Sequence, residues 1–132
     1  MANVTATLTK IKASHAPYEV TFNAATEATA STAQTFELAI DRADIDVLLL
    51  IQNGGDAAIT YSFGEGILGQ PLSLNDATVN SVAAGKTAAV KIDTSFTMGH
   101  DGKVMLTLTP ASGKAITTAK VAVIENAQSY GR

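Results

Sequence analysis

The two histidines are the side chains with the widest chemical range in this sequence, because a neutral imidazole can serve as a general base or as a metal ligand. His15 and His100 are far apart in the chain, and neither lies in a two-ligand spacing such as H-x-x-x-H. His100 and Asp101 lie close to Ser95, but the chain has no G-x-S-x-G nucleophile motif. The stretch MGHDGK around them is typical of a turn between strands. We therefore expect no catalytic residues, no enzyme activity and no metal site.

Two further stretches carry residue types that bind ions or phosphates. The segment DRADID, residues 41–46, has three carboxylates but lacks the order of a calcium-binding loop. The segment GEGILG, residues 64–69, is rich in glycine but lacks the Lys-Ser/Thr pair of a phosphate-binding loop. We interpret the first as a solvated turn and the second as a bend, and we expect no cofactor.

Charge and composition exclude several partners. Lys and Arg number 9 against 12 Asp and Glu, for a formal net charge of -3, which gives no electrostatic footprint for a nucleic acid backbone. The densest apolar run, 47–51, is far shorter than the ~20 residues that a membrane span needs. Cysteine is absent, which fits synthesis in a reducing compartment. We expect neither a nucleic acid nor a membrane as partner, and no export signal.

Alternation of apolar and polar residues sets the fold class. It recurs over six segments, each of which predicts a strand with one dry and one wet face. These segments are 4–9, 18–22, 36–41, 58–63, 87–92 and 104–109. With aromatic residues at only 5%, the core must consist mainly of Val, Ile, Leu and Ala. We predict an all-β protein, an antiparallel β-sandwich of jelly-roll-like or Ig-like type with about seven or eight strands and little helix.

Two segments, DVLLLIQ at 46–52 and KVAVIE at 120–125, have apolar residues on both faces and are candidates for central strands. The first ends in Asn53-Gly54-Gly55-Asp56, from which we predict a hairpin that places 47–52 beside 58–63. Leu48 and Leu50 would then lie on the outer face of a sandwich, exposed unless something covers them. The N-terminal arm, the loop 64–86 or a second subunit could provide that cover.

The N-terminal region differs in composition from the rest. The stretch NAATEATASTAQ, residues 23–34, is small and polar, which favours a mobile connection. We interpret residues 1–33 as an arm and residues 34–132 as the sandwich domain. The alternative is that the two strand-like pieces of the arm join a sheet edge. The long stretch 64–86 contains Ile67, Leu68, Leu72 and Leu74, which favours docking against a partner over plain solvation.

The order of these segments resembles the small β-sandwich decoration (cement) proteins of tailed-phage capsids. The resemblance covers residues 34–125 and rests on three stretches, LLIQNGG, the Gly64-Glu65-Gly66 bend and VAAGKTAAV. It implies a structural protein that binds the outer surface of the capsid and reinforces contacts between major capsid protein subunits. It also implies a homotrimer with an N-terminal arm, made in the host cytoplasm and located on the virion exterior.

From this resemblance we predict contact residues toward the capsid or a sister subunit. They are the apolar side chains of the arm, of the outer face and of the long loop: Val4, Leu8, Ile11, Tyr18, Leu48, Leu50, Ile67, Leu68, Leu72 and Leu74. Two other functions stay open. One is another virion part, such as a tail or fibre domain, and the other is an adhesive or carbohydrate-binding surface module.

Overall fold

The chain folds into ten strands in the part that the computed structural model describes, which comprises residues 3–40, 47–64, 80–92 and 103–126. The strands are β1 (Val4–Ala6), β2 (Leu8–Ile11), β3 (Asn23–Ala24), β4 (Gln34–Leu38), β5 (Val47–Asn53), β6 (Ile59–Phe63), β7 (Ser81–Val82), β8 (Thr87–Ile92), β9 (Val104–Thr109) and β10 (Ala119–Asn126).

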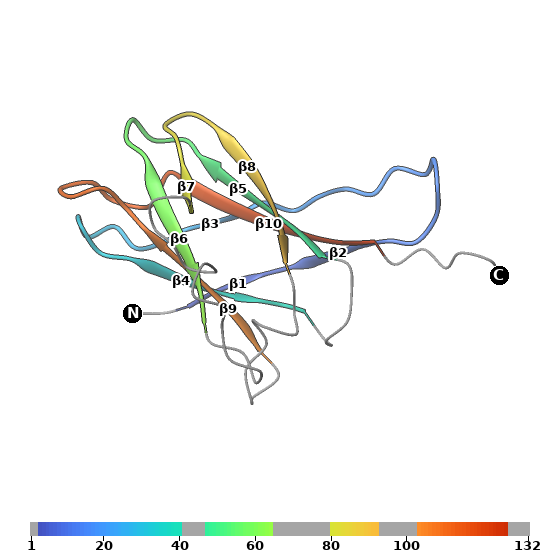
Figure 1. Cartoon of the computed structure of the whole chain (residues 1–132). Coiled ribbons are helices and arrows are strands. Elements are labelled where there is room, and N and C mark those ends of the chain that lie inside the picture. The colour runs from blue at the N-terminus through green and yellow to red at the C-terminus, as the bar shows by residue number, and fades with distance from the viewer. Residues whose placement is uncertain (1–2, 41–46, 65–79, 93–102, 127–132) are drawn as a thin grey trace.

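The strands form two sheets that enclose one core, as a β-sandwich does (Figure 1). Sheet A has the order β1-β4-β9-β6-β7, and sheet B has the order β2-β10-β5-β8, with β3 also paired to β10. Alternate residues of both sheets point inward and are buried, among them Phe36 and Leu106 from sheet A and Leu49 and Val121 from sheet B. The all-β sandwich class predicted from the alternation is confirmed.

The sheets are mixed, whereas we expected purely antiparallel ones. β1 pairs in parallel with β4, and β2 pairs in parallel with β10, while the other pairs are antiparallel. Both parallel pairs involve the N-terminal strands, which reach their partners after a long path through the chain. Such pairings depend on the whole topology, so the local alternation could not predict them.

The two segments with apolar residues on both faces are β5 and β10, and they are the two interior strands of sheet B. That prediction is confirmed. They pair along their full length, from Val47 opposite Glu125 to Asn53 opposite Ala119. Each of these strands has a neighbouring strand on both sides, so its backbone groups are paired along both edges.

The predicted hairpin between 47–52 and 58–63 is wrong. β5 belongs to sheet B and β6 to sheet A, so the chain crosses from one sheet to the other at residues 54–58. Neither Gly54 nor Gly55 has a positive φ; instead they let the backbone approach Thr118. A Cβ on Gly54 would lie 3.0 Å from the Thr118 carbonyl oxygen, and one on Gly55 would lie 2.9 Å from its Oγ1.

The N-terminal residues add strands to both sheets, so the first of the two strand-like pieces, residues 4–9, joins sheet edges. β1 lies at the edge of sheet A, and after Thr7 the chain passes to sheet B as β2. The chain then extends beyond the strands and returns to β3 (Figure 1). The strand predicted at 18–22 is not formed; only Asn23–Ala24 pairs with β10. Ala6 is fully buried in the core, so β1 is packed against the sandwich.

The connection from residue 25 to residue 33 is held by specific hydrogen bonds. The buried Gln34 side chain accepts from the backbone N–H groups of Thr26 at 3.1 Å and Glu27 at 3.0 Å. The N–H of Ser31 donates to the Lys114 carbonyl oxygen at 2.8 Å, and the Gly113 N–H donates to the Ser31 Oγ at 2.7 Å. These contacts tie a stretch of low complexity to the sandwich at several points.

Candidate functional site

The outer face of sheet B carries apolar side chains that do not belong to the core. Leu48 on β5 has Lys91 of β8 on one side and Ile124 of β10 on the other. Because cross-strand partners share a face, these side chains point away from the core together. Leu48 is 39% exposed, and Leu50 is half-buried. The prediction that one set of the five-residue run lies on the outer face is confirmed.

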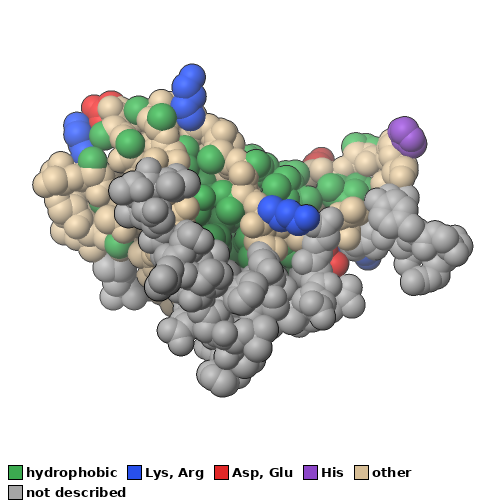
Figure 2. All heavy atoms as spheres, in the orientation of Figure 1, with side chains coloured by type: hydrophobic (Ala, Val, Ile, Leu, Met, Phe, Trp, Pro, Cys, Tyr) green, Lys and Arg blue, Asp and Glu red, His purple; other side chains and the backbone are tan. Residues whose placement is uncertain are grey.

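A hollow of about 440 Å³ lies on this face, at the end of sheet B where β5 begins and β10 ends. It is lined by residues of all four strands in the order of sheet B: Ile11, Val47, Leu48, Lys91, Ile124 and Asn126. Its surface is mostly apolar, with one cation at the rim. Figure 2 shows hydrophobic side chains gathered where β5, β8 and β10 lie in Figure 1. We call this feature the sheet B hollow.

Further apolar side chains are exposed between β2 and β3. Val20 is 37% exposed and Phe22 is 39% exposed, and neither belongs to the core. The Thr9 Oγ1 donates to the Glu19 carbonyl oxygen at 3.5 Å, which places this segment beside β2 on its return. Among the described residues, these two and Leu48 are the large hydrophobic side chains with the greatest exposure.

The predicted contact residues divide into four groups, apart from Leu50, which is half-buried on the outer face of sheet B and does not line the hollow. Ile11 and Leu48 meet in the sheet B hollow. Val4 and Leu8 are half-buried and pack against the core of this chain, so in this structure they do not project outward. Tyr18 is half-buried and belongs to no strand; it lies in the segment between β2 and β3. Four residues of the long loop lie outside the described residues: Ile67, Leu68, Leu72 and Leu74.

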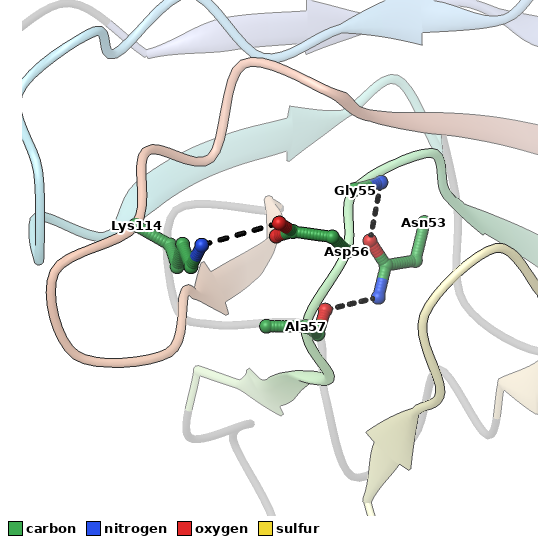
Figure 3. A network of polar contacts seen from close by, with 5 residues as sticks. All are labelled: Asn53, Gly55, Asp56, Ala57 and Lys114. Atoms are coloured by element: carbon green, nitrogen blue, oxygen red, sulfur yellow. Dashed lines mark hydrogen bonds and ion pairs between the residues drawn. The ribbon is translucent and has the colours of Figure 1, made fainter.

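A smaller cavity of about 90 Å³ lies where the chain crosses between the sheets, and it is lined by polar groups as well as apolar ones. The buried Asn53 side chain donates to the Ala57 carbonyl oxygen at 2.9 Å and accepts from the Gly55 N–H at 3.1 Å (Figure 3). Lys114 forms an ion pair with Asp56 at 3.2 Å, with both side chains largely exposed. The hydrogen bonds of Asn53 hold the crossing in shape, and the exposed ion pair is worth at most about 1 kcal/mol.

Tyr61 lies at the border of the core, on the inner side of β6. Its ring packs edge-on against Phe63, with the ring centres 6.0 Å apart. It is partly buried, and this burial raises the pKa of its hydroxyl group above the ordinary value of 10.0. The neutral phenol is therefore the form that the fold favours.

The side chains that could act in catalysis or bind a metal do not assemble into a site in the described part of the chain. No group of three or more His, Asp or Glu side chains there could hold a metal ion. His15 is exposed in the turn after β2. Ser95, His100, Asp101 and the carboxylates of 41–46 lie outside the described residues. Within the described ranges, no helix has the length and apolar character needed to cross a membrane.

Four residues of the sheet B hollow were not among the predicted contact residues: Val47, Lys91, Ile124 and Asn126. Alternation along KVAVIE places Ile124 on the other face of the strand from Val121 and Val123, so its outward position could be predicted from the sequence. The proximity of Ile124 to Leu48 could not be predicted, because it depends on the register of β5 and β10.

Comparison with known proteins finds no family model, no curated protein and no solved structure that matches this chain.

Proposed function

We propose that this chain is a structural virion protein that binds the outer surface of a tailed-phage capsid and reinforces contacts between major capsid protein subunits. The observation that carries the proposal is the sheet B hollow, an apolar depression on a sheet face that points away from the core. The resemblance of residues 34–125 to capsid decoration proteins supplies the identity of the partner.

The energetics favour a partner on this face. Burying a Leu side chain completely stabilises by about 1.5–3 kcal/mol relative to full exposure. Leu48 is only partly buried, and it lies beside Ile11 and Ile124 in the same hollow. A capsid subunit that inserts an apolar side chain would remove this group from water. Many such modest contacts, repeated over the shell, would together resist the opening of a joint.

Binding to shells tests the proposal directly. Purified protein is mixed with expanded empty shells of the phage that encodes it, and the bound fraction is measured after sedimentation. We expect Leu48→Asp to weaken binding about tenfold or more, because a carboxylate in an apolar contact must lose its hydration. Ser112→Asp is the matched control, because Ser112 is exposed and lies far from the hollow. It is in the turn before Lys114, whose ion pair with Asp56 lies beyond the opposite end of β5. This variant should bind as the wild type does.

Three results would contradict the proposal. Wild-type protein that does not sediment with shells would overturn the function. If Leu48→Asp bound shells as tightly as the wild type does, the sheet B hollow would not be the surface that contacts the shell. Sedimentation with tails instead of heads, or binding to glycans by a protein that ignores shells, would favour the tail-domain or the adhesive reading respectively.

A further inference from the structure

β8 is an edge strand with an open side. It is the last strand of sheet B, and in the described residues only β5 pairs with it. The pairing with β5 runs without interruption from Thr87 opposite Gln52 to Ile92 opposite Val47. The strand has neither a proline nor a bulge, two of the devices that commonly protect sheet edges.

The register shows which backbone groups point to the open side. The Asn53 N–H donates to the Lys86 carbonyl oxygen at 2.9 Å, and these two residues continue the β5–β8 register. In an antiparallel pair, successive residues turn their N–H and C=O groups alternately toward and away from the neighbouring strand. Ala88, Val90 and Ile92 therefore face β5. The backbone groups of Thr87, Ala89 and Lys91 face outward.

The side chains on β8 also leave room for a neighbour. Ala88 and Val90 pack against the core but stay half-buried, because sheet B ends at this strand. On the outer face, Thr87, Ala89 and Lys91 are exposed. Lys91 is the only charged residue of the strand that could discourage pairing. A further strand beside β8 would satisfy the outward backbone groups and cover Val90.

We propose that β8 pairs antiparallel with β8 of a second copy of this chain, about a two-fold axis that passes by Ala89. In this register Ala89 lies opposite the partner's Ala89, and Thr87 lies opposite the partner's Lys91. All three outward-facing residues find partners, and sheet B continues from one copy into the next. On the inner face, Val90 lies beside the partner's Ala88.

The arrangement of charge selects a second copy in this register. The outward-facing residues read Thr, Ala, Lys, with the small alanine at the centre, so the strand is complementary to itself when reversed. A shift that brings Lys91 opposite the partner's Lys91 places like charges side by side, which is unfavourable. A shift in the opposite direction moves Lys91 past the end of the second copy's β8, so that no strand residue lies opposite it. This pairing does not depend on shell binding, and it differs from the trimer that the resemblance implies.

The mass of the full chain in solution tests this inference. Sedimentation equilibrium at low salt, where charge effects are least screened, should give a two-copy mass. Thr87→Lys should weaken the association about threefold to tenfold, because it puts lysine opposite lysine at both ends of the paired strands. Thr87→Glu should tighten it by a similar factor. The double variant Thr87→Lys/Lys91→Glu should restore it, since the lysine at position 87 then lies opposite a glutamate of the second copy.

Each other result overturns the inference. A single-copy mass at every concentration tested excludes the pairing. A two-copy or three-copy mass that does not respond to Thr87→Lys and Thr87→Glu places the contact elsewhere. Thr87 and Lys91 are exposed, so urea unfolding of each variant should match that of the wild type at protein concentrations low enough for all of them to be single copies, where association adds nothing to stability. Shell binding is measured separately, so its failure would leave this result intact.

Discussion

Asn53 shows how one buried polar side chain can direct the chain between two sheets. Its Nδ2 donates to the carbonyl oxygens of Ala57 at 2.9 Å and Val82 at 3.0 Å, and its Oδ1 accepts from the Gly55 N–H. It is 1% exposed, so no water replaces these bonds when one is lost. The side chain thus fastens the end of β5 to the start of the crossing and to β7.

Replacing Asn53 should therefore cost more than a surface substitution. We expect Asn53→Ala to lower the free energy of unfolding by about 2–4 kcal/mol, because buried backbone groups lose their partners. Asn53→Asp should also destabilise, since a carboxylate cannot donate to the two carbonyl oxygens. Urea unfolding measures both. Asn23→Ala is the comparison: the Asn23 side chain also donates to two carbonyl oxygens, of Thr21 and Val121, but both bonds are 3.3 Å long and partly or fully exposed, so its loss should cost less. Stability equal to the wild type in Asn53→Asp would contradict the role of Asn53.

Tyr61 predicts a pH dependence at the alkaline end. Burial raises its pKa in the folded chain above the ordinary value of 10.0, so the folded state holds the phenolic proton more tightly than the unfolded state. This contribution to stability is fully present below pH 10 and is lost as the pH rises through the folded pKa. The unfolding free energy of Tyr61→Phe should fall less steeply above pH 10 than that of the wild type. Parallel curves would show that Tyr61 does not cause the loss.

At the scale of elements, the N-terminal strands β1 and β2 form one edge of each sheet. β1 ends in the fully buried Ala6, whose carbonyl oxygen accepts from the Ala39 N–H at 3.0 Å. The chain then changes sheet within one residue, so this short segment contacts both layers of the sandwich. That packing differs from an arm that is free to leave the domain.

A pair of aspartate substitutions in β1 tests whether this strand is packed in solution. Ala6→Asp buries a carboxylate and should lower the free energy of unfolding by about 3 kcal/mol or more. Thr5→Asp places the same group on the exposed side of the same strand, where repulsion from the like charge of Glu37 on β4 should cost about 1 kcal/mol or less. Urea unfolding compares them. Equal stability of the two variants would mean that β1 is detached from the core.

The elements were predictable from the sequence where alternation is strong, and their partners were not. β4, β6, β8 and β9 each lie within or close to a predicted segment, and the central places of β5 and β10 follow from their double-sided apolar character. The turn after β5 misled because glycines suit a hairpin and a close crossing equally well. The segment 18–22 alternates too, but alternation cannot show that a segment lacks a neighbouring strand.

The same limit applies to the candidate site. The five-residue run places Leu48 on an outer face by periodicity alone, whatever the topology. The hollow around Leu48 requires Ile11 and Ile124, which are distant in sequence and meet only through the pairing of β10 with β5 and β2. The sequence therefore identified two members of the site, Ile11 and Leu48, while their proximity and the other members depend on the register.

At the scale of the whole molecule, the two sheets are not equivalent. Sheet B carries the hollow on its outer face and an open edge at β8, and Lys91 belongs to both features. Single exposed apolar residues are ordinary on protein surfaces, but Leu48 lies in a hollow with three other apolar residues, Ile11, Val47 and Ile124. Sheet B is thus the layer through which this chain would contact both a shell and a second copy.

The central claim is that the outer face of sheet B completes its packing against another subunit. A reconstruction of the shells decorated with this protein measures that most directly. The account predicts that Leu48 and Ile124 lie in contact with a capsid subunit, with their exposed area removed from solvent. A reconstruction in which the protein is bound while this face points into solvent would contradict it.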